Sequence, residues 1–346
     1  MTYRIVQWAT GSIGKTCLRA VLDSPDCELA GLYVYSDRKL GRDAGSIARR
    51  PDTGVLATND IEDILRLDAD VVIHTARLQL PYELHDNDIC RLLRSGKNVI
   101  TTAGQHYPWA HGPERAEMFL DACHAGGTSL YGAGVSPGFV GERLALTLAS
   151  AALELDAIVI DEVFDASGML SPDFVFTVMG MGTDPAQTDL MTGPLPELYR
   201  KLYSETLCFM ADSLGLTGYT VDSDHHLELA AEDLTVRAGT IRKATVVATE
   251  WRWHVVTDGR RRLSLSIIWT MDPTLPRYAG RPHWQLRMTG KPELTMSLDL
   301  HDPVGAEVMT TGGQYVVAGL VLRAIPVVVA ADPGIVTPYV FAPYQA

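Results

Sequence analysis

The stretch Ala9-Thr10-Gly11-Ser12-Ile13-Gly14 decides the fold. Residues 3–9 form an apolar run that predicts a first strand, and residues 14–23 have the periodicity of an amphipathic helix. Between such a strand and such a helix, the backbone must turn sharply and present free N–H groups to a diphosphate. Gly11 would permit the close approach of that ligand, and Gly14 the close packing of the helix on the strand.

The six residues read A-x-G-x-x-G, because alanine stands where the usual G-x-G-x-x-G pattern has its first glycine. Glycines that serve only a tight turn would leave the same pattern. The loop lies in the first strand–turn–helix unit of an alternating chain, so we interpret it as a dinucleotide-binding loop. The expected cofactor contacts are this loop and two residues after a later strand core: Thr10, Gly11, Ser12, Ile13, Gly14, Thr75 and Ala76.

The first 135 residues alternate short apolar runs with amphipathic stretches, which is typical of strand–helix units around a parallel sheet. We predict an α/β fold whose N-terminal domain is a Rossmann domain with a doubly wound parallel sheet. Further strands are expected at residues 28–35, 71–73, 98–100 and 128–131, and further helices at 84–95 and 114–125.

The pattern changes after Phe139. We expect a helix at 141–153, a strand at 158–164, a loop at 179–196, and strands at 240–254, 263–271, 284–288 and 294–300. These segments predict an α+β second domain with an open, mainly antiparallel sheet. The last helix, at 314–331, should pack back onto the first domain. The expected division is 1–139 with about 312–346 for the Rossmann domain, and 140–311 for a substrate-binding and dimerisation domain.

Composition limits the choice of partners. The 346 residues carry a net charge of −13, which disfavours nucleic acid and anionic membrane surfaces. We see no apolar run that approaches the roughly 18 to 20 residues needed to span a bilayer. The five cysteines are scattered without C-x-x-C spacing, and the histidines lack paired ligand spacing, so we expect no disulfide frame and no metal. A cytoplasmic protein is the plain expectation.

The end of the second predicted strand bears on the choice between NAD and NADP. A carboxylate there would bind the ribose 2′-hydroxyl and repel a 2′-phosphate, but this chain has Ser36. Arg38 and Lys39 could pair with a 2′-phosphate, although Asp37 beside them leaves a solvated charge cluster as the alternative. We therefore expect NADP(H) to be preferred and NAD(H) to be possible.

Short motifs along nearly the whole chain resemble the family of bacterial NAD(P)-dependent amine dehydrogenases related to 2,4-diaminopentanoate dehydrogenase. That family shares an N-terminal domain with dihydrodipicolinate reductase. The resemblance implies a homodimer with its active site between the domains. Dihydrodipicolinate reductase itself is disfavoured, since its basic, histidine-rich motif has no counterpart here. The motifs are VQW (6–8), GRDAG (41–45), GVLATND (54–60), SPGF (136–139), DASG (165–168), SP (171–172), MGMG (179–182), AGTI (238–241) and PGIVT (333–337).

The resemblance also implies a glutamate after the fifth strand that manages protons and ammonium. In this sequence Gly104 or Gln105 stands at its place, and a glutamine cannot accept a proton. His106 and Tyr107 are the nearest titratable side chains and could donate a proton to a developing alkoxide. A packed loop histidine and a structural tyrosine are the alternatives. The expected catalytic set is Gln105, His106 and Tyr107.

Two further segments complete the expected site. The loop after the sixth strand lies at the carboxyl edge of the sheet, and the resemblance implies that it contacts the nicotinamide through Ser136, Pro137 and Gly138. In the second domain a polar residue and three apolar ones could meet the substrate, although such apolar residues are more often core. They are Asp165, Met169, Phe174 and Met179.

The leading hypothesis is an NAD(P)H-dependent reductase of carbonyl or imine groups on a small, mainly apolar substrate. Reversible amine dehydrogenation is the closest named activity, and its small-molecule partner would be an amine, an imine or a carbonyl compound. Two alternatives stay open. One is a ketone or aldehyde reductase that never uses ammonia, and the other is a cofactor-bound sensor without turnover.

Overall fold

The structure, a computed structural model, describes residues 2–186, 192–305 and 310–345, and it divides into two compact units. Unit 1 comprises Met1–Phe139 and His301–Tyr339, and unit 2 comprises Val140–Leu300 and Val340–Ala346. The chain thus returns to unit 1 at His301, earlier than the expected position near 312. Its tail ends in unit 2, where the Tyr344 hydroxyl accepts a hydrogen bond from the Leu155 N–H at 3.2 Å.

Unit 1 is built on a seven-stranded sheet in which every adjacent pair of strands is parallel. The strand order is β15-β6-β5-β4-β1-β2-β3. This arrangement confirms the predicted parallel sheet of the N-terminal domain. The strands are β1 (Tyr3–Trp8), β2 (Cys27–Tyr33), β3 (Ala57–Thr58), β4 (Val71–His74), β5 (Asn98–Thr101), β6 (Ser129–Gly132) and β15 (Gly334–Val336).

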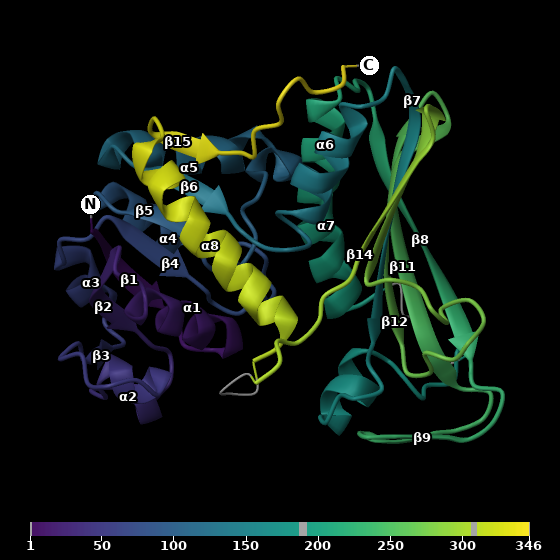
Figure 1. Ribbon diagram of the computed structural model, residues 1–346, viewed down its shortest axis with the longest axis horizontal. Helices are drawn as coiled ribbons and strands as arrows, with labels where there is room; N and C mark the ends of the chain where they lie inside the picture. The colour runs from purple at the N-terminus through teal and green to yellow at the C-terminus, as the bar shows by residue number, and fades with distance from the viewer. Residues whose placement is uncertain (1, 187–191, 306–309, 346) are drawn as a thin grey trace. The chain divides into compact units, whose positions relative to one another are not determined.

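Helices cover both faces of this sheet because its central strands bury apolar side chains on both sides. One apolar core includes α1 and α8, and the other includes α4 and α5. Figure 1 shows α8, in yellow, and α1, in purple, side by side over the same part of the unit. The helices are α1 (Ser12–Leu22), α2 (Ala44–Ala48), α3 (Ile61–Arg66), α4 (Asp86–Arg94), α5 (Pro113–Gly126) and α8 (Gly312–Ala330), with short 3-10 turns η1 (Asp37–Lys39) and η2 (Pro108–His111).

Helix α8 corrects one expectation. It is 19 residues long and apolar enough, by length and composition, to cross a membrane, so the sequence does hold an apolar run of that length. Packing explains only part of this composition, because 22% of the apolar stretch is buried. Ala318, Val321, Ile325 and Val328 are buried in the same core as α1 and the sheet, and Pro326 is accommodated inside the helix. The prediction that this helix packs onto the first domain is confirmed.

Unit 2 contains a six-stranded sheet in the order β14-β13-β7-β12-β11-β8. All neighbouring strands are antiparallel except β7 and β12, so the predicted open, mainly antiparallel sheet is confirmed. A separate ribbon joins β9 (Leu234–Val236) to β10 (Gly239–Ile241). The six strands are β7 (Glu154–Asp165), β8 (Thr220–Leu229), β11 (Val246–Thr257), β12 (Arg260–Thr270), β13 (Trp284–Lys291) and β14 (Leu294–Leu298).

Helix α7 (Pro194–Ser213) packs on one face of this sheet. Tyr203 lies 5.1 Å from Trp253 between ring centroids, and Tyr199 contacts both Trp251 and Trp269. These tryptophans are therefore packing residues of the sheet. The other helical segments are η3 (Val140–Ala145) and η4 (Asp173–Val178), both π-helical, and α6 (Leu146–Ala149).

Some boundaries of unit 2 differ from expectation. The predicted helix at 141–153 ends at Ala149, and the predicted strand at 240–254 is two strands separated by a turn with Ala244 at φ +63°. The predicted loop at 179–196 is shortened by α7, whose first residue is Pro194; residues 187–191 of that loop lie outside the described part of the chain. Strand β8 was not predicted, because acidic and histidine residues interrupt its apolar pattern.

Candidate functional site

A hollow of about 530 Å³ lies at the carboxyl ends of β1, β2 and β4 in unit 1. This is the edge of an open parallel sheet at which ligands bind. The structure gathers most of the expected cofactor residues around it. Its lining consists of Ala9, Thr10, Gly11, Ser12, Ile13, Tyr35, Ser36, Lys39, Thr75, Ala76, Arg77, Leu78 and Thr102.

Gly14 lies beneath the lining and has a packing role. A Cβ atom at this position would stand 2.4 Å from the Ala9 carbonyl oxygen and 2.6 Å from Thr75 Oγ1, distances that only glycine avoids. Ala9 itself is left-handed at φ +70°, a conformation that glycine would adopt more easily. Gln7 holds the turn from below, because its Nε2 donates to the Ala9 carbonyl at 3.0 Å and to Thr75 Oγ1 at 2.9 Å. No sequence pattern predicts this role of Gln7.

Gly11, unlike Gly14, has open space around it. It is the N-cap of α1 with φ −68° and ψ −165°, and a Cβ atom there would meet nothing within 4 Å. Throughout α1, every residue of which the structure describes, the first turn carries no acidic side chain and no side chain caps the free N–H groups. An uncapped helix N-terminus that opens on a hollow is an anion cradle, since its amides and its dipole both favour negative charge.

The segment after β2 supplies the positive charge of this hollow. Lys39 Nζ donates to the Thr10 carbonyl at 2.9 Å and to Thr10 Oγ1 at 2.8 Å, so the ammonium lies against the glycine loop. Burial, together with repulsion from Lys15 and Arg42, lowers the pKa of Lys39. Ser36 shares the lining, whereas Arg38 is exposed and lies outside it.

The segment expected to carry catalysis begins with a residue that is fully buried. Gln105 has φ +60°, its Nε2 donates to Asp86 Oδ1 at 3.0 Å, and its Oε1 accepts from Thr101 Oγ1 at 3.3 Å. Asp86 is in turn held by Arg115, at 2.8 Å from Nε and 3.0 Å from Nη2. Both ends of the Gln105 amide are therefore occupied inside unit 1, which makes it a positioning residue for the loop that follows.

His106 and Tyr107 follow in different surroundings. The His106 residue is 7% exposed and lies against β6, where a Cβ at Gly132 would come within 2.8 Å of its Nδ1. Glycine at this position thus makes room for the imidazole ring. Tyr107 is half-buried, with its ring 4.9 Å from that of Trp109.

The segment Ser136-Pro137-Gly138 lies directly after β6, outside the lining of the hollow. Gly138 has φ +115°, and a Cβ there would stand 2.7 Å from the Gly134 nitrogen. Its glycine is therefore required by a tight turn. Ser136 is half-buried.

His74, at the carboxyl end of β4, was missed by the sequence analysis. Its ring is fully buried, with Nδ1 3.1 Å from Thr101 Oγ1 and the ring centroid 5.3 Å from that of His85. Burial lowers the pKa of His74 to about 3, helped by repulsion from His85. The imidazole is therefore neutral, and it adds a polar, uncharged group beside Thr75 and Ala76.

The residues expected to contact the substrate differ in their solvent exposure. Asp165 is exposed at the end of β7, where its Oδ1 accepts from the Ser167 N–H at 2.9 Å. Met169 and Phe174 are half-buried, and the Phe174 ring lies 6.2 Å from Trp269. Met179 is fully buried, and its expected contact with a substrate stays a prediction.

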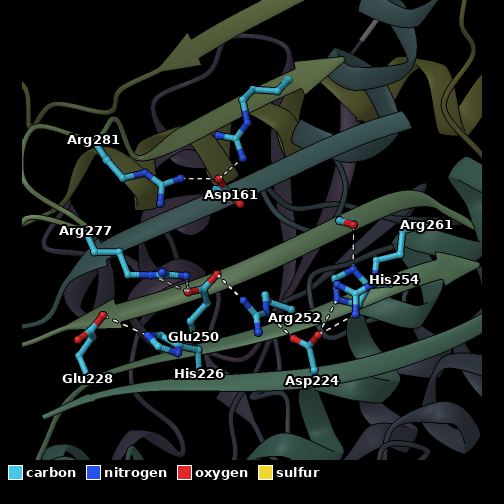
Figure 2. A network of polar contacts seen from close by, with 12 residues as sticks. Asp161, Asp224, His226, Glu228, Glu250, Arg252, His254, Arg261, Arg277 and Arg281 are labelled. Carbon is cyan, nitrogen blue, oxygen red and sulfur yellow. Dashed lines mark hydrogen bonds and ion pairs between the residues drawn. The ribbon is translucent and has the colours of Figure 1, made fainter. Parts of the chain in front are cut away.

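A second hollow, of about 460 Å³, lies in unit 2 on the sheet and involves no residue of the expected site. Figure 2 shows the polar network around it. In the described ranges 2–186, 192–305 and 310–345, no group of three metal-ligating side chains is found. The second hollow is lined by Val159, Asp161, Glu250, Arg252, His254, Ser264, Ser266, Arg277, Arg281 and Arg287.

Comparison with known proteins gives the relatives of this chain. Residues 5–104 match the family model described as the N-terminus of dihydrodipicolinate reductase. The chain is 28% identical over 347 residues to an amine dehydrogenase of Streptomyces virginiae, covering 95% of this chain and 93% of that protein.

Solved structures agree with these sequence matches. An amine dehydrogenase from Mycobacterium smegmatis has a TM-score of 0.73 at 18% identity, covering 99% of this chain and 97% of its own. An apo scyllo-inositol dehydrogenase from Lactobacillus casei has a TM-score of 0.55 at 12% identity, covering 99% of this chain and 91% of its own. The predicted fold, the predicted resemblance and the predicted enzyme class, an NAD(P)-dependent oxidoreductase, are confirmed.

Proposed function

We propose that this chain, an NAD(P)-dependent oxidoreductase related to amine dehydrogenases, reduces a carbonyl or imine group on a small, mainly apolar substrate. The observation that carries the proposal is the hollow at the glycine loop. Free amides of α1, the bare Gly11 and the Lys39 ammonium converge there, and about 530 Å³ of space suits part of a dinucleotide. Reversible amine dehydrogenation is the closest named activity.

A nicotinamide coenzyme would supply the hydride when bound. In the proposed arrangement, the amides of residues 11–14 bind its diphosphate, and the neutral His74 keeps the neighbouring wall free of a second positive charge. His106 is the proposed proton donor to the oxygen or nitrogen of the substrate, because an imidazole ring is a common general acid in catalysis. Ser136 is proposed to contact the carboxamide of the coenzyme.

One observation favours the second reading, a ketone or aldehyde reductase that does not use ammonia. The amine dehydrogenases are expected to use a glutamate where this chain has Gly104 or Gln105. The Gln105 side chain is fully buried and bonded to Asp86 and Thr101, and its neutral amide carries no charge that would hold an ammonium ion. Without general acid–base help at this place, a reaction typically slows by roughly 10²–10⁴-fold.

NADPH oxidation by the purified protein tests both readings. We expect oxidation with small apolar ketones or aldehydes alone, and at most a severalfold increase when concentrated ammonium is added. His106→Ala should lower turnover by about 10²-fold or more. A protein that binds the coenzyme tightly yet oxidises none of it, across a broad carbonyl and imine panel, would instead be a sensor.

We propose NADP(H) as the preferred coenzyme, with NAD(H) accepted less well. The support is the missing carboxylate at Ser36 and the Lys39 ammonium with Lys15 and Arg42 nearby. Because Lys39 lines the hollow and Arg38 does not, Lys39→Gln should raise the Kd for NADPH about 10- to 100-fold and leave that for NADH within about threefold. Arg38→Gln is the matched control and should have a smaller effect. Equal losses for both coenzymes in Lys39→Gln would contradict this assignment.

We also propose an oligomeric state, a cellular location and a set of substrate contacts. Unit 2 is proposed to bind the substrate and to form a homodimer, which light scattering of the purified protein can check. All five cysteines are free thiols, which fits the proposed cytoplasmic location. The proposed substrate contacts stay Asp165, Met169, Phe174 and Met179, and mutation of each with measurement of KM tests them.

A further inference from the structure

A chain of hydrogen bonds joins His74, at the carboxyl end of β4, to the loop that carries His106. His74 and Thr101 are register partners on the neighbouring parallel strands β4 and β5, so their side chains lie next to each other on one face of the sheet. His74 Nδ1 lies 3.1 Å from Thr101 Oγ1, and Thr101 Oγ1 lies 3.3 Å from Gln105 Oε1. All of these residues belong to unit 1.

The direction of each hydrogen bond in this chain follows from its charged end. Arg115 and Asp86 form a buried ion pair, and an ionised carboxylate only accepts hydrogen bonds. Gln105 Nε2, which lies 3.0 Å from Asp86 Oδ1, is therefore the end of the amide that faces the carboxylate, and Oε1 faces Thr101. Because a carbonyl oxygen only accepts, the Thr101 hydroxyl donates its single proton to Gln105.

His74 is then the donor to Thr101. The hydroxyl proton of Thr101 is already used, and its oxygen also accepts from the Ala103 N–H at 3.1 Å. The remaining lone pair of that oxygen can bind His74 only through an N–H at Nδ1. The hydrogen bond that a ring nitrogen makes decides which nitrogen carries the proton. The contacts thus assign the neutral imidazole of His74 to the tautomer that is protonated at Nδ1.

The other ring nitrogen of His74 stabilises nothing. Nε2 is buried and has no hydrogen-bond partner within residues 2–186, 192–305 and 310–345. The neighbouring His85 ring, 5.3 Å away between centroids, has its own Nε2 3.0 Å from the Arg77 carbonyl oxygen. A buried nitrogen without a partner lowers the stability of a protein. The feature of His74 that an apolar side chain could not supply is therefore the N–H that binds Thr101.

The loop at the end of this chain has a backbone that must be held. Gly104 and Gln105 have consecutive positive backbone angles, φ +106° and +60°. A residue other than glycine keeps such a conformation only where its surroundings fix it. The Gln105 side chain is fixed from two sides, by Asp86 and by Thr101, and His106 follows it directly. A change in the orientation of the Thr101 hydroxyl would therefore reach the backbone of His106.

We propose that His74, protonated at Nδ1, is a positioning residue of the proposed reaction. Its N–H orients the Thr101 hydroxyl toward Gln105, and Gln105 in turn fixes the loop that places the His106 imidazole. The inference rests on the proposed function, in which His106 is the proton donor. It adds that the end of β4, beside the coenzyme hollow, and the loop after β5 are coupled through one buried N–H.

Nuclear magnetic resonance of the full-length protein without coenzyme tests the tautomer. With both histidine ring nitrogens isotope-labelled, the His74 signals, identified by their loss in His74→Asn, should be those of a neutral ring protonated at Nδ1. This pattern should be lost in Thr101→Val, which removes the acceptor. The matched control is Thr128→Val, because it removes another buried hydroxyl, bonded to the Leu93 carbonyl near the amino end of β6, and should leave the pattern unchanged. A ring protonated at Nε2 in the native protein overturns the proposal.

The His106 ring signals and turnover test the positioning role. His74→Leu removes the N–H, so the His106 signals should shift and kcat should fall about 10- to 100-fold, while the Kd for NADPH stays within about threefold. The amide nitrogen of asparagine is separated from Cα by the same number of bonds as Nδ1. His74→Asn should therefore keep kcat within about fivefold of the native value. The melting temperature of His74→Leu should not fall, because the unpartnered Nε2 is removed together with the N–H.

The outcomes separate this inference from the proposed function. If no carbonyl or imine compound is reduced, the proposed function fails, and the ring signals alone decide whether His74 positions His106. Unchanged His106 signals in His74→Leu overturn the inference, as does a kcat that falls equally in His74→Leu and His74→Asn. A kcat that falls in step with coenzyme affinity and melting temperature also overturns it, since the role of His74 would then be structural.

Discussion

Gly14→Ala is expected to abolish measurable coenzyme binding, whereas Gly11→Ala should weaken binding and leave the fold unchanged. The two glycines lie three positions apart in one loop, but their surroundings differ. A Cβ at position 14 would overlap the Ala9 carbonyl and Thr75 Oγ1, and a Cβ at position 11 meets nothing within 4 Å. The first change forces backbone apart beneath the hollow, and the second adds a methyl group only where the diphosphate would approach.

The expected sizes follow from these geometries. Forcing a methyl group into a closed contact typically costs about 1–3 kcal/mol, so Gly14→Ala should lower the free energy of unfolding by that amount. At position 11 the backbone angles, φ −68° and ψ −165°, suit alanine, and the cost should be about 1 kcal/mol or less. The Kd for NADPH should nevertheless rise at least tenfold in Gly11→Ala.

Thermal unfolding and calorimetric titration with NADPH measure the two effects separately. Normal coenzyme affinity in Gly11→Ala, with an unchanged melting temperature, would show that the diphosphate does not lie over this loop. A Gly14→Ala protein as stable as the native one would show that the turn relaxes around the added methyl group. In either case, the role of the loop in the proposed function would have to be revised.

The loop was predictable from sequence because its chemistry is local. The glycine spacing, the strand before it and the helix after it all lie within residues 3–23. Each of the three has its own local sequence pattern. Gln7 and Ser36 show how far prediction from the sequence reaches. Both lie in strand or loop segments close to the glycine loop, yet only Ser36 follows a known rule, while the contact of Gln7 with Thr75 joins residues far apart in the chain.

Segments that mix charged and apolar residues were the hardest to predict from the sequence. Strand β8 contains five acidic or histidine positions, and its outer face is polar because it contributes to the arginine network on the sheet. Long-range charge pairing of this kind leaves no periodic signal. The same is true of Gln105, whose role depends on Asp86 and Arg115 in two separate helices.

A second large effect is expected when the buried ion pair of Asp86 and Arg115 is broken. Arg115, in α5, and Asp86, at the start of α4, form an ion pair with side chains only 8% and 7% exposed. The Arg115 guanidinium also lies over the Tyr82 ring, 4.8 Å from its centroid. Arg115→Met would keep much of the side-chain volume but leave the Asp86 carboxylate buried without its cation. Breaking such a pair from one side typically costs about 3–5 kcal/mol, and we expect a loss of that size in the free energy of unfolding.

Two matched variants separate this from a general effect of losing an arginine. Arg91→Met removes a partner of Glu62 from α4, where the side chains are 34% and 53% exposed, and should cost about 1 kcal/mol or less. Asp86→Asn/Arg115→Met removes both charges and keeps an acceptor for Gln105, so it should recover most of the stability lost in Arg115→Met. Chemical denaturation measures all three variants.

The same pair should also matter for turnover, because Asp86 holds Gln105 and Gln105 precedes His106. In Asp86→Asn/Arg115→Met, assayed where it is folded, the Kd for NADPH should stay within about threefold of the native value while kcat falls. That split is expected because the glycine loop and Lys39 lie outside this network, whereas the proposed proton donor is attached to it. An unchanged kcat together with full recovery of stability would remove the Asp86 network, and with it the positioning of His106, from the mechanism.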